Sequence, residues 1–263
     1  MPQSSRKTRD RQLAKLYERR RRERFRKRRQ RIVAASVGIV VALGGVGGGL
    51  FLLAKGGKAK PQASASPSAS PTTGVACGGS VPAAASEKKP SYQKAPKTTI
   101  DPGKTYTATM VTSCGTVEFK LDPKLAPHTV NSFVFLARKH FYDGLTFHRI
   151  ARDFVIQGGD PTGTGSGGPG YKTVDVPPKG SKYPLGTVAM AKGGNEPAGT
   201  AGSQFFIMTG KNSSLSPDYA IIGTVVKGQD VADRIGALPI ASNATDGKPV
   251  QTVYIVTITI KVS

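Results

Sequence analysis

The side chains best suited to catalysis here are three histidines and two cysteines, and their spacing supports none of the common reaction centres. The histidines His128, His140 and His148 lack the partners that a hydrolytic triad needs. The sequence contains no G-x-S-x-G, H-E-x-x-H or C-x-x-C motif. Cys77 and Cys114 have no histidine or cysteine neighbour at metal-ligand spacing. We therefore expect no metal site and no hydrolytic or redox centre.

A glycine-rich stretch at residues 163–168 reads GTGSGG and matches the G-x-G-x-x-G pattern of dinucleotide sites. Such a site needs a helix that opens within the motif and directs its N-terminus at the phosphates. Residues 169–171 read PGY, which favours a turn instead. We expect no nucleotide and no other cofactor.

Two other segments combine an arginine, glutamines and aromatic residues. Residues 147–160 read FHRIARDFVIQGGD, and residues 201–207 read AGSQFFI. These segments resemble the F-H-R, F-x-x-Q-G-G-D and G-S-Q-F-F signatures of the cyclophilin-type peptidyl-prolyl cis/trans isomerases. The likeness extends from about residue 106 to the C-terminus, and it implies an enzyme that rotates X-Pro peptide bonds.

The chemistry of that rotation agrees with these residue types. Peptide-bond resonance resists rotation with a barrier of about 18–20 kcal/mol, so X-Pro isomerisation takes tens to hundreds of seconds. Lowering the barrier requires an apolar pocket for the ring, polar groups that hold the backbone, and a donor that withdraws the nitrogen lone pair from the carbonyl. A planar guanidinium that is always charged suits the last task.

The resemblance assigns catalytic roles to five residues. Arg149 would be the donor, and Gln157 and Gln204 would orient Arg149 or the substrate backbone. Phe154 and Phe206 would line the pocket for the proline ring. Without the resemblance, the same side chains would be interpreted as a surface charge, polar strand residues and core aromatic residues.

Substrate contacts are expected from a second set of residues. Val155 and Leu215 would complete the proline pocket, and Ala191 and Lys192 would flank the residue before proline. His148 would either contact substrate or support the site. Tyr219 stands where many cyclophilins have a histidine, and Ser214 stands where they have a tryptophan, a residue that this chain lacks.

The elements that must position these residues are mostly short strands. Apolar and β-branched patterns predict a hairpin from residues 106–112 and 116–121, a helix at 126–139 and a shorter helix at 231–235. We expect a mainly β fold, a closed eight-stranded antiparallel barrel capped by one or two helices. The remaining strands are predicted at residues 146–150, 154–157, 187–191, 204–209, 220–226 and 252–262.

The net charge of +22 is concentrated near the N-terminus. Residues 1–31 hold 15 of the 38 Lys and Arg residues and three of the 16 acidic residues. This segment is either a topogenic signal attracted to anionic lipids or a nucleic-acid-binding tail. Its position directly before an apolar run favours the first interpretation, and we expect no nucleic-acid partner.

The apolar run at residues 32–54 contains no charged residue. A helix of about 23 residues spans a hydrocarbon core of about 30 Å. The run is longer than the apolar core of a cleaved signal peptide and ends in KGGK, so we expect an uncleaved transmembrane helix. The basic flank predicts a single-pass cell-membrane protein with a cytoplasmic N-terminus and an extracytoplasmic catalytic domain.

Residues 55–103 are rich in Ala, Ser, Pro, Lys and Gly, a composition typical of a flexible, disordered linker. Residues 104–263 form the expected catalytic domain, which we take to be monomeric. The two cysteines, Cys77 and Cys114, permit one disulfide in an oxidising compartment, although two free thiols are the alternative.

These patterns lead to one functional expectation and one alternative. The expected function is peptidyl-prolyl isomerisation that assists the folding of exported proteins, with proline-containing polypeptides as clients. The alternative is a tethered proline-binding chaperone module in which turnover is incidental.

Overall fold

The computed structural model describes residues 74–211 and 215–263. The predicted basic segment, the predicted transmembrane helix and the first part of the predicted linker lie outside these residues, as does Ser214. Within the part of the chain that is described, no helix has the length and apolar character needed to span a bilayer.

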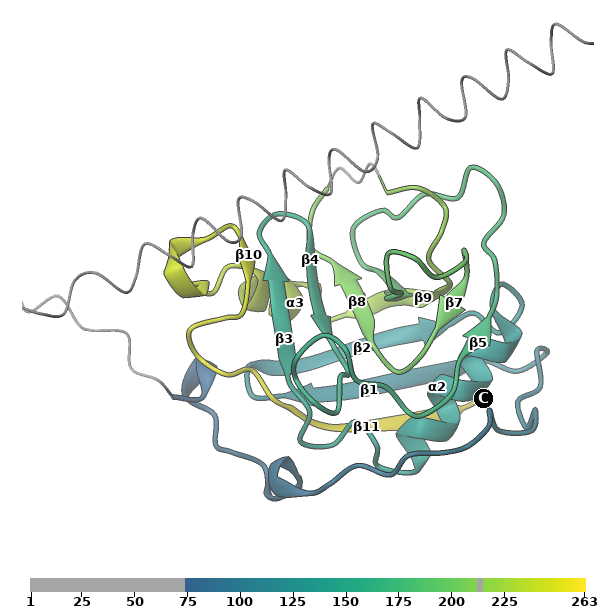
Figure 1. Cartoon of the computed structure of the whole chain (residues 1–263), viewed down its shortest axis with the longest axis horizontal. Helices are drawn as coiled ribbons and strands as arrows, with labels where there is room; N and C mark the ends of the chain where they lie inside the picture. The colour runs from purple at the N-terminus through teal and green to yellow at the C-terminus, as the bar shows by residue number, and fades with distance from the viewer. Residues whose placement is uncertain (1–73, 212–214) are drawn as a thin grey trace, which may run out of the picture. The chain divides into compact units, whose positions relative to one another are not determined.

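A curled sheet of nine strands dominates the described residues, in the order β10-β3-β4-β8-β6-β9-β2-β1-β11 (Figure 1). All pairs between neighbouring strands are antiparallel. A separate two-stranded sheet joins β5 and β7. The strands are β1 (Tyr106–Thr112), β2 (Gly115–Leu121), β3 (Phe147–Ala151), β4 (Val155–Gly158), β5 (Thr173–Val174), β6 (Thr187–Met190), β7 (Thr200–Ala201), β8 (Phe205–Met208), β9 (Ile221–Lys227), β10 (Asp246–Gly247) and β11 (Ile255–Val262).

The observed topology differs from the closed eight-stranded barrel that the sequence predicted. β3 uses Ile150 and Ala151 to pair with the two-residue strand β10, so only its other end approaches β11. There, the isolated bridge between Thr146 and Tyr254 and backbone hydrogen bonds between residues 144–147 and 253–255 join the two sides of the sheet. The sheet is therefore a curled half-barrel, because its two sides join only at one end, over residues 144–147 and 253–255, and not along the length of the outer strands.

In the described part of the chain, two α-helices pack against the sheet, as the sequence predicted. Helix α2 (Pro127–Arg138) lies beside β5 and β11, and α3 (Gln229–Gly236) lies against β2, β3 and β4 (Figure 1). Pro127 occupies the first turn of α2, where its missing N–H costs no helical hydrogen bond. Short 3₁₀ turns occur at η1 (Ala76–Gly78), η2 (Ala83–Ser86) and η3 (Ala241–Asn243).

The interior of the sheet is filled by a cluster of aromatic side chains. Phe133 of α2 contacts the rings of Phe119, Tyr142 and Phe205, at centroid separations of 5.7, 5.1 and 5.9 Å. All four side chains are fully buried. Because the helix and three distant segments of the chain share this cluster, it fixes the curvature that the strands adopt.

Residues 74–103, which we call the N-terminal strap, differ from the expected flexible linker. Their backbone bonds to the domain at both ends of the strap. Near its start, Ala76 N–H donates to the Thr252 carbonyl over 2.9 Å. Near its end, Thr99 N–H donates to Oδ1 of Asn131 over 2.9 Å, and Ile100 is buried. The composition concealed this order because hydrogen bonds to backbone groups and a few apolar contacts supply the anchoring.

Tyr92 is the main side-chain anchor in the middle of the strap. Its ring lies 5.1 Å from Phe135 and 6.3 Å from Tyr171, between centroids. Its N–H donates to the carbonyl of Pro169 over 2.8 Å. The strap therefore supports the loop that runs from residue 160 to residue 172.

A disulfide joins the strap to the hairpin of β1 and β2. It links Cys77 to Cys114 across 37 residues of sequence, with the two Cα atoms 5.0 Å apart. In the structure the cysteines are thus paired and are not free thiols. The link makes the strap part of the same covalent unit as the sheet.

Replacing both cysteines with serine should destabilise the oxidised protein. A crosslink restricts the unfolded chain, and its loss costs about 2–4 kcal/mol of unfolding free energy. Urea unfolding of the full-length Cys77→Ser/Cys114→Ser variant and of the oxidised wild type measures this difference. The reduced wild type is the control and should match the variant. Equal stability of the oxidised wild type and the variant would contradict the expectation.

Candidate active site

Four neighbouring strands place one side chain each in a row across the outer face of the sheet. Arg149 on β3 lies opposite Gln157 on β4, which lies opposite Phe206 on β8. Phe206 in turn lies opposite Ala189 on β6. Directly paired residues project from the same face of a sheet. Residues from three distant parts of the sequence therefore form one continuous surface.

Successive side chains along each strand point alternately to this surface and to the interior of the sheet. On β4, Ile156 belongs to the large interior cluster, whereas Val155 belongs to a second cluster on the outer face. On β8, Phe205 belongs to the interior cluster and Phe206 belongs to the cluster on the outer face. A period of two residues produces this division. The outer cluster is thus a built apolar surface beside Arg149 and Gln157.

The guanidinium of Arg149 is held by two partners. Its Nε and one Nη donate to the carboxylate of Asp246 over 2.7 and 2.6 Å. The other Nη donates to Oε1 of Gln157 over 3.0 Å. The Arg149 side chain remains 37% exposed, so the group is fixed in orientation but open to a ligand.

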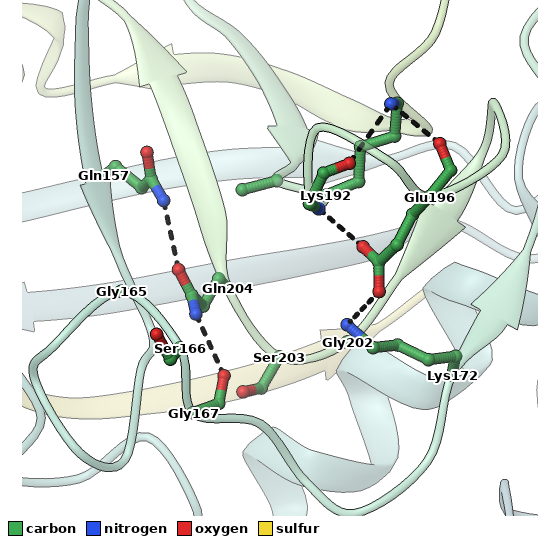
Figure 2. Close-up of a pocket in the computed structure, with 12 residues that line it drawn as sticks. Gln157, Gly165, Ser166, Gly167, Lys172, Lys192, Glu196, Gly202, Ser203 and Gln204 are labelled. Atoms are coloured by element: carbon green, nitrogen blue, oxygen red, sulfur yellow. Dashed lines mark hydrogen bonds and ion pairs between the residues drawn. The ribbon is translucent and has the colours of Figure 1, made fainter. Parts of the chain in front are cut away.

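The two glutamines continue this hydrogen-bond chain. Nε2 of Gln157 donates to Oε1 of Gln204 over 3.0 Å, and Nε2 of Gln204 donates to the carbonyl of Gly167 over 2.9 Å (Figure 2). Because each amide accepts at oxygen and donates at nitrogen, every dipole in the chain has the same sense. The orientation of Arg149 is therefore coupled to the loop that contains Gly167.

The outer apolar cluster combines buried and partly exposed side chains. Phe206 and Tyr183 are buried, and Tyr219 packs on both, with centroid separations of 5.6 and 6.2 Å. Partly exposed Phe154 and Leu215 lie at its edge. This arrangement offers a ring-sized ligand an apolar surface with an open side. The buried members are Ala151, Val155, Tyr183, Ala189, Phe206 and Met208.

Tyr183 fixes the segment that carries Tyr219. The Tyr183 hydroxyl donates to the Tyr219 carbonyl over 2.9 Å and accepts from the Tyr219 N–H over 3.0 Å. Burial raises the pKa of Tyr183, and nearby Asp218 adds to the increase. The hydroxyl therefore remains protonated at neutral pH and keeps both hydrogen bonds.

A pocket of about 280 Å³ adjoins the two glutamines (Figure 2). Its polar wall includes Glu196, which accepts from Gly193 N–H over 2.5 Å and from Lys172 Nζ over 3.0 Å. These two interactions lower the pKa of Glu196. Lys192 Nζ donates to the Glu196 carbonyl over 3.0 Å and lies 5.6 Å from the Tyr219 ring centroid. The pocket thus combines charged groups with the edge of the apolar cluster.

His148 lies beside the loop at residues 160–167 and does not join the Arg149 network. Within the described residues, neither of its ring nitrogens has a hydrogen-bond partner. Burial lowers the pKa of His148, against the opposing effect of the nearby Asp160 carboxylate. Burial alone would raise the pKa of Asp160, but hydrogen bonds from Thr162, Gly167 and Gly165 lower it. Asp160 therefore stays ionised and shapes this loop.

The structure brings most of the expected site residues together. Arg149, Gln157 and Gln204 form one hydrogen-bonded chain, and Ala191 N–H donates to the Gln204 carbonyl over 2.9 Å. Lys192 is at the pocket, whereas His148 is set apart from the network. The apolar residues of the prediction, which are Phe154, Val155, Phe206, Leu215 and Tyr219, share the outer cluster.

Two residues of the site were not predicted from the sequence. Asp246 lies 97 residues beyond Arg149 on a strand of two residues, which is too short to produce an alternating pattern. Tyr183 lies in a segment without regular secondary structure. A Thr-Asp-Gly turn signal at residues 245–247 marks the position of Asp246 but gives no indication of its partner.

Comparison with protein families gives a match over nearly the whole sheet. The model described as "Cyclophilin type peptidyl-prolyl cis-trans isomerase/CLD" matches residues 107–260. Peptidyl-prolyl cis-trans isomerase A of Mycobacterium tuberculosis is 41% identical over 181 residues, which cover 62% of this chain and 96% of that protein. Peptidyl-prolyl cis-trans isomerase B of Bacillus subtilis is 44% identical over 118 residues, or 44% of this chain and 80% of that protein.

Solved structures give a similar result. A cyclophilin-type isomerase of Cryptosporidium parvum superposes with a TM-score of 0.54 and 30% identity, covering 60% of this chain and 98% of the other. A second structure of that protein, obtained in the presence of the dipeptide Ala-Pro, gives a TM-score of 0.53 and 31% identity over 59% of this chain and 98% of the other.

The lowered pKa of His148 predicts a pH-dependent stability. In the unfolded chain the pKa of histidine returns to about 6.5, so below that pH the unfolded state binds the proton first. The free energy of unfolding should therefore decrease as the pH falls below about 6.5, until the pH is lower than the folded-state pKa.

Urea unfolding between about pH 7.5 and about pH 5 tests this prediction on the full-length protein. The decrease should be smaller in His148→Gln than in the wild type. His128→Gln is the matched control, because His128 is exposed on α2. An unchanged pH dependence in His148→Gln would contradict the prediction.

Proposed function

Since the chain belongs to the cyclophilin-type peptidyl-prolyl cis-trans isomerase family and is such an isomerase, we propose that Arg149 is its catalytic donor. The observation that carries this assignment is the row across the sheet, in which Arg149 and Gln157 directly adjoin Phe206. The site thus pairs a fixed cation with an apolar surface for a proline ring. No other arginine of the described residues lies in that row.

The proline ring of the substrate is assigned to the outer apolar cluster. Phe206 and Val155 form its buried floor, and Phe154, Leu215 and Tyr219 stand around it, partly exposed. Transfer of an apolar ring from water to such a surface stabilises the complex by about 25 cal/mol per Å² of buried area. The Ala-Pro dipeptide present with the Cryptosporidium relative supports a proline-containing ligand.

Polar groups beside that cluster are assigned to the peptide backbone. Gln157 and Gln204 stand between Arg149 and the pocket, and each keeps hydrogen-bonding capacity at its amide group. Ala191 and Lys192 line the same pocket and would flank the residue before proline. His148 is assigned a supporting role at the adjacent loop.

Arg149 promotes rotation because its hydrogen bond to the substrate strengthens during the reaction. In the planar peptide bond the nitrogen lone pair is delocalised into the carbonyl and is a poor acceptor. As the bond twists, the lone pair localises on nitrogen and can accept an N–H from the guanidinium. An interaction that is stronger in the transition state than in the ground state lowers the barrier. No nucleophile and no proton transfer are required.

Arg149→Ala should reduce kcat/KM by about 10²–10³-fold, the effect of removing one preorganised donor to developing charge. Arg149→Lys should recover only part of this loss, because an ammonium group lacks the planar set of donors. A proline-peptide isomerisation assay on the full-length protein in detergent micelles measures both effects. Thermal unfolding shows whether each variant is folded. Wild-type turnover by a folded Arg149→Ala variant would exclude the assignment.

The alternative function is a tethered proline-binding chaperone in which turnover is incidental. The same Arg149→Ala variant separates the two functions if refolding of a proline-limited client protein is measured alongside peptide turnover. Loss of both activities supports enzymatic assistance of folding. Loss of peptide turnover with unchanged client refolding supports the chaperone.

The proposed location is the extracytoplasmic side of the cell membrane. Three features support it: the uncharged run at residues 32–54, the basic segment before it, and the disulfide at Cys77 and Cys114. Disulfides persist in oxidising compartments and are rare in the cytosol. Newly exported proteins would then be the clients, and the catalytic domain would act as a monomer at the end of its anchor.

Membrane attachment through residues 32–54 predicts a clear fractionation result. The full-length chain should stay with membranes after carbonate extraction, and a variant that lacks residues 32–54 should be released. In cells whose outer layers have been removed but whose cell membrane is intact, added protease should cleave the isomerase domain but not the basic segment. Release of the full-length chain by carbonate, or protection of the domain from protease, would contradict the proposed topology.

A further inference from the structure

The carboxylate of Asp246 occupies one whole edge of the Arg149 guanidinium. Asp246 Oδ1 accepts from Nε over 2.7 Å, and Oδ2 accepts from an Nη over 2.6 Å. Such bidentate pairs fix the plane of the guanidinium as well as its position. This partner of Arg149 lies on β10, which is far along the sequence from the segments that carry the recognised motifs.

Three of the five N–H groups of Arg149 are engaged in the described structure. Two go to Asp246, and one goes to Gln157. A guanidinium has one N–H on Nε and two on each Nη, so one N–H remains on each Nη within the described part of the chain. The remaining N–H of the Nη that binds Asp246 lies on the edge of the guanidinium opposite to the arginine stem.

The backbone of β10 determines where the Asp246 carboxylate lies. Asp246 pairs with Ala151 on β3, and Gly247 pairs with Ile150. Arg152 N–H also donates to the Thr245 carbonyl over 2.8 Å. Since Arg149 and Ala151 project from the same face, Asp246 is the diagonal cross-strand neighbour of Arg149. The carboxylate is thus held by a strand that pairs directly with the strand that carries the arginine.

The loop that carries β10 is itself anchored. Ile240, which is 2% exposed, forms an isolated bridge with Pro249. Ala241 N–H donates to the Lys248 carbonyl over 2.9 Å, and Val250 N–H donates to the Pro239 carbonyl over 2.8 Å. These contacts close the segment on both sides of Asp246. The carboxylate therefore has a fixed base although its own side chain is 50% exposed.

From this geometry we propose that Asp246 is a positioning residue of the isomerase, one that fixes the plane of Arg149 so that an unengaged N–H is available to the substrate. The proposal rests on the catalytic role of Arg149 given above. A half-exposed arginine without Asp246 would keep its charge and its bond to Gln157 but could rotate about its terminal torsions. Asp246 removes that freedom before substrate binds, so its contribution appears in the transition state and not in substrate affinity.

Asp246→Ala should lower kcat/KM for a proline peptide about tenfold in the full-length protein, mainly through kcat, with KM changed less than about twofold. Asp246→Asn keeps one acceptor oxygen and should lose only about threefold. The Nε–H resonance of Arg149 in ¹⁵N NMR spectra should move upfield and exchange faster with water in Asp246→Ala. Loss of the hydrogen bond to Asp246 causes this change.

The matched control is Asp230→Ala. Asp230 pairs with Arg234 on the surface of α3 at 3.3 Å, so this variant breaks an aspartate–arginine contact away from the site. Its kcat/KM should stay within about twofold of the wild type. A double variant, Asp246→Ala with Arg149→Ala, should be no slower than Arg149→Ala alone, because Asp246 acts through Arg149.

Several outcomes would overturn the proposal. One is an unchanged or increased kcat/KM in a folded Asp246→Ala variant. An increase would mean that the carboxylate keeps Arg149 away from the substrate. Another is a further loss when Asp246→Ala is added to Arg149→Ala. If Asp246→Ala fails to fold, the Asp246→Asn variant tests the proposal instead. Wild-type turnover by a folded Asp246→Asn variant would then overturn it. Failure of the catalytic assignment is distinct, because Arg149→Ala alone would then retain activity.

Discussion

The orientation of one guanidinium group is the constraint on which the active site depends. Arg149 is half-exposed, and three hydrogen bonds to Asp246 and Gln157 determine its direction. A free arginine side chain samples many rotamers, so a donor aimed at one atom must be held by its neighbours. Gln204 extends the same network to the carbonyl of Gly167. Strands β3, β4 and β10, and the residue directly before β8, supply the groups of this network.

The apolar part of the site follows from the two faces of a single sheet. Neighbouring residues such as Phe205 and Phe206 point in opposite directions, so one strand supplies both the interior and the ligand surface. The aromatic cluster around Phe133 fixes the curl of the sheet from within. That curl brings the outer side chains of β3, β4, β8 and β6 into one surface.

The strap shows how order can arise from a segment of low hydrophobicity. Residues 74–103 bury few large side chains, yet they are held by backbone hydrogen bonds, the ring of Tyr92 and the disulfide. Tyr92 also bonds to Pro169, in the loop that contains Gly167. The strap therefore supports the same loop that completes the hydrogen-bond chain from Arg149. Residues 74–103 and the active site therefore belong to one folded unit.

The sequence by itself determined the family, the two helices, most strands and the residues Arg149, Gln157 and Phe206, because long motifs and local periodicity are properties of contiguous residues. Only the tertiary structure decided the half-barrel, the course of the strap and the partner of Arg149. The two-residue strand β10 produces no periodic signal, and Asp246 meets Arg149 across 97 residues. Contacts of that kind depend on how strands pair in space, which a local pattern does not encode.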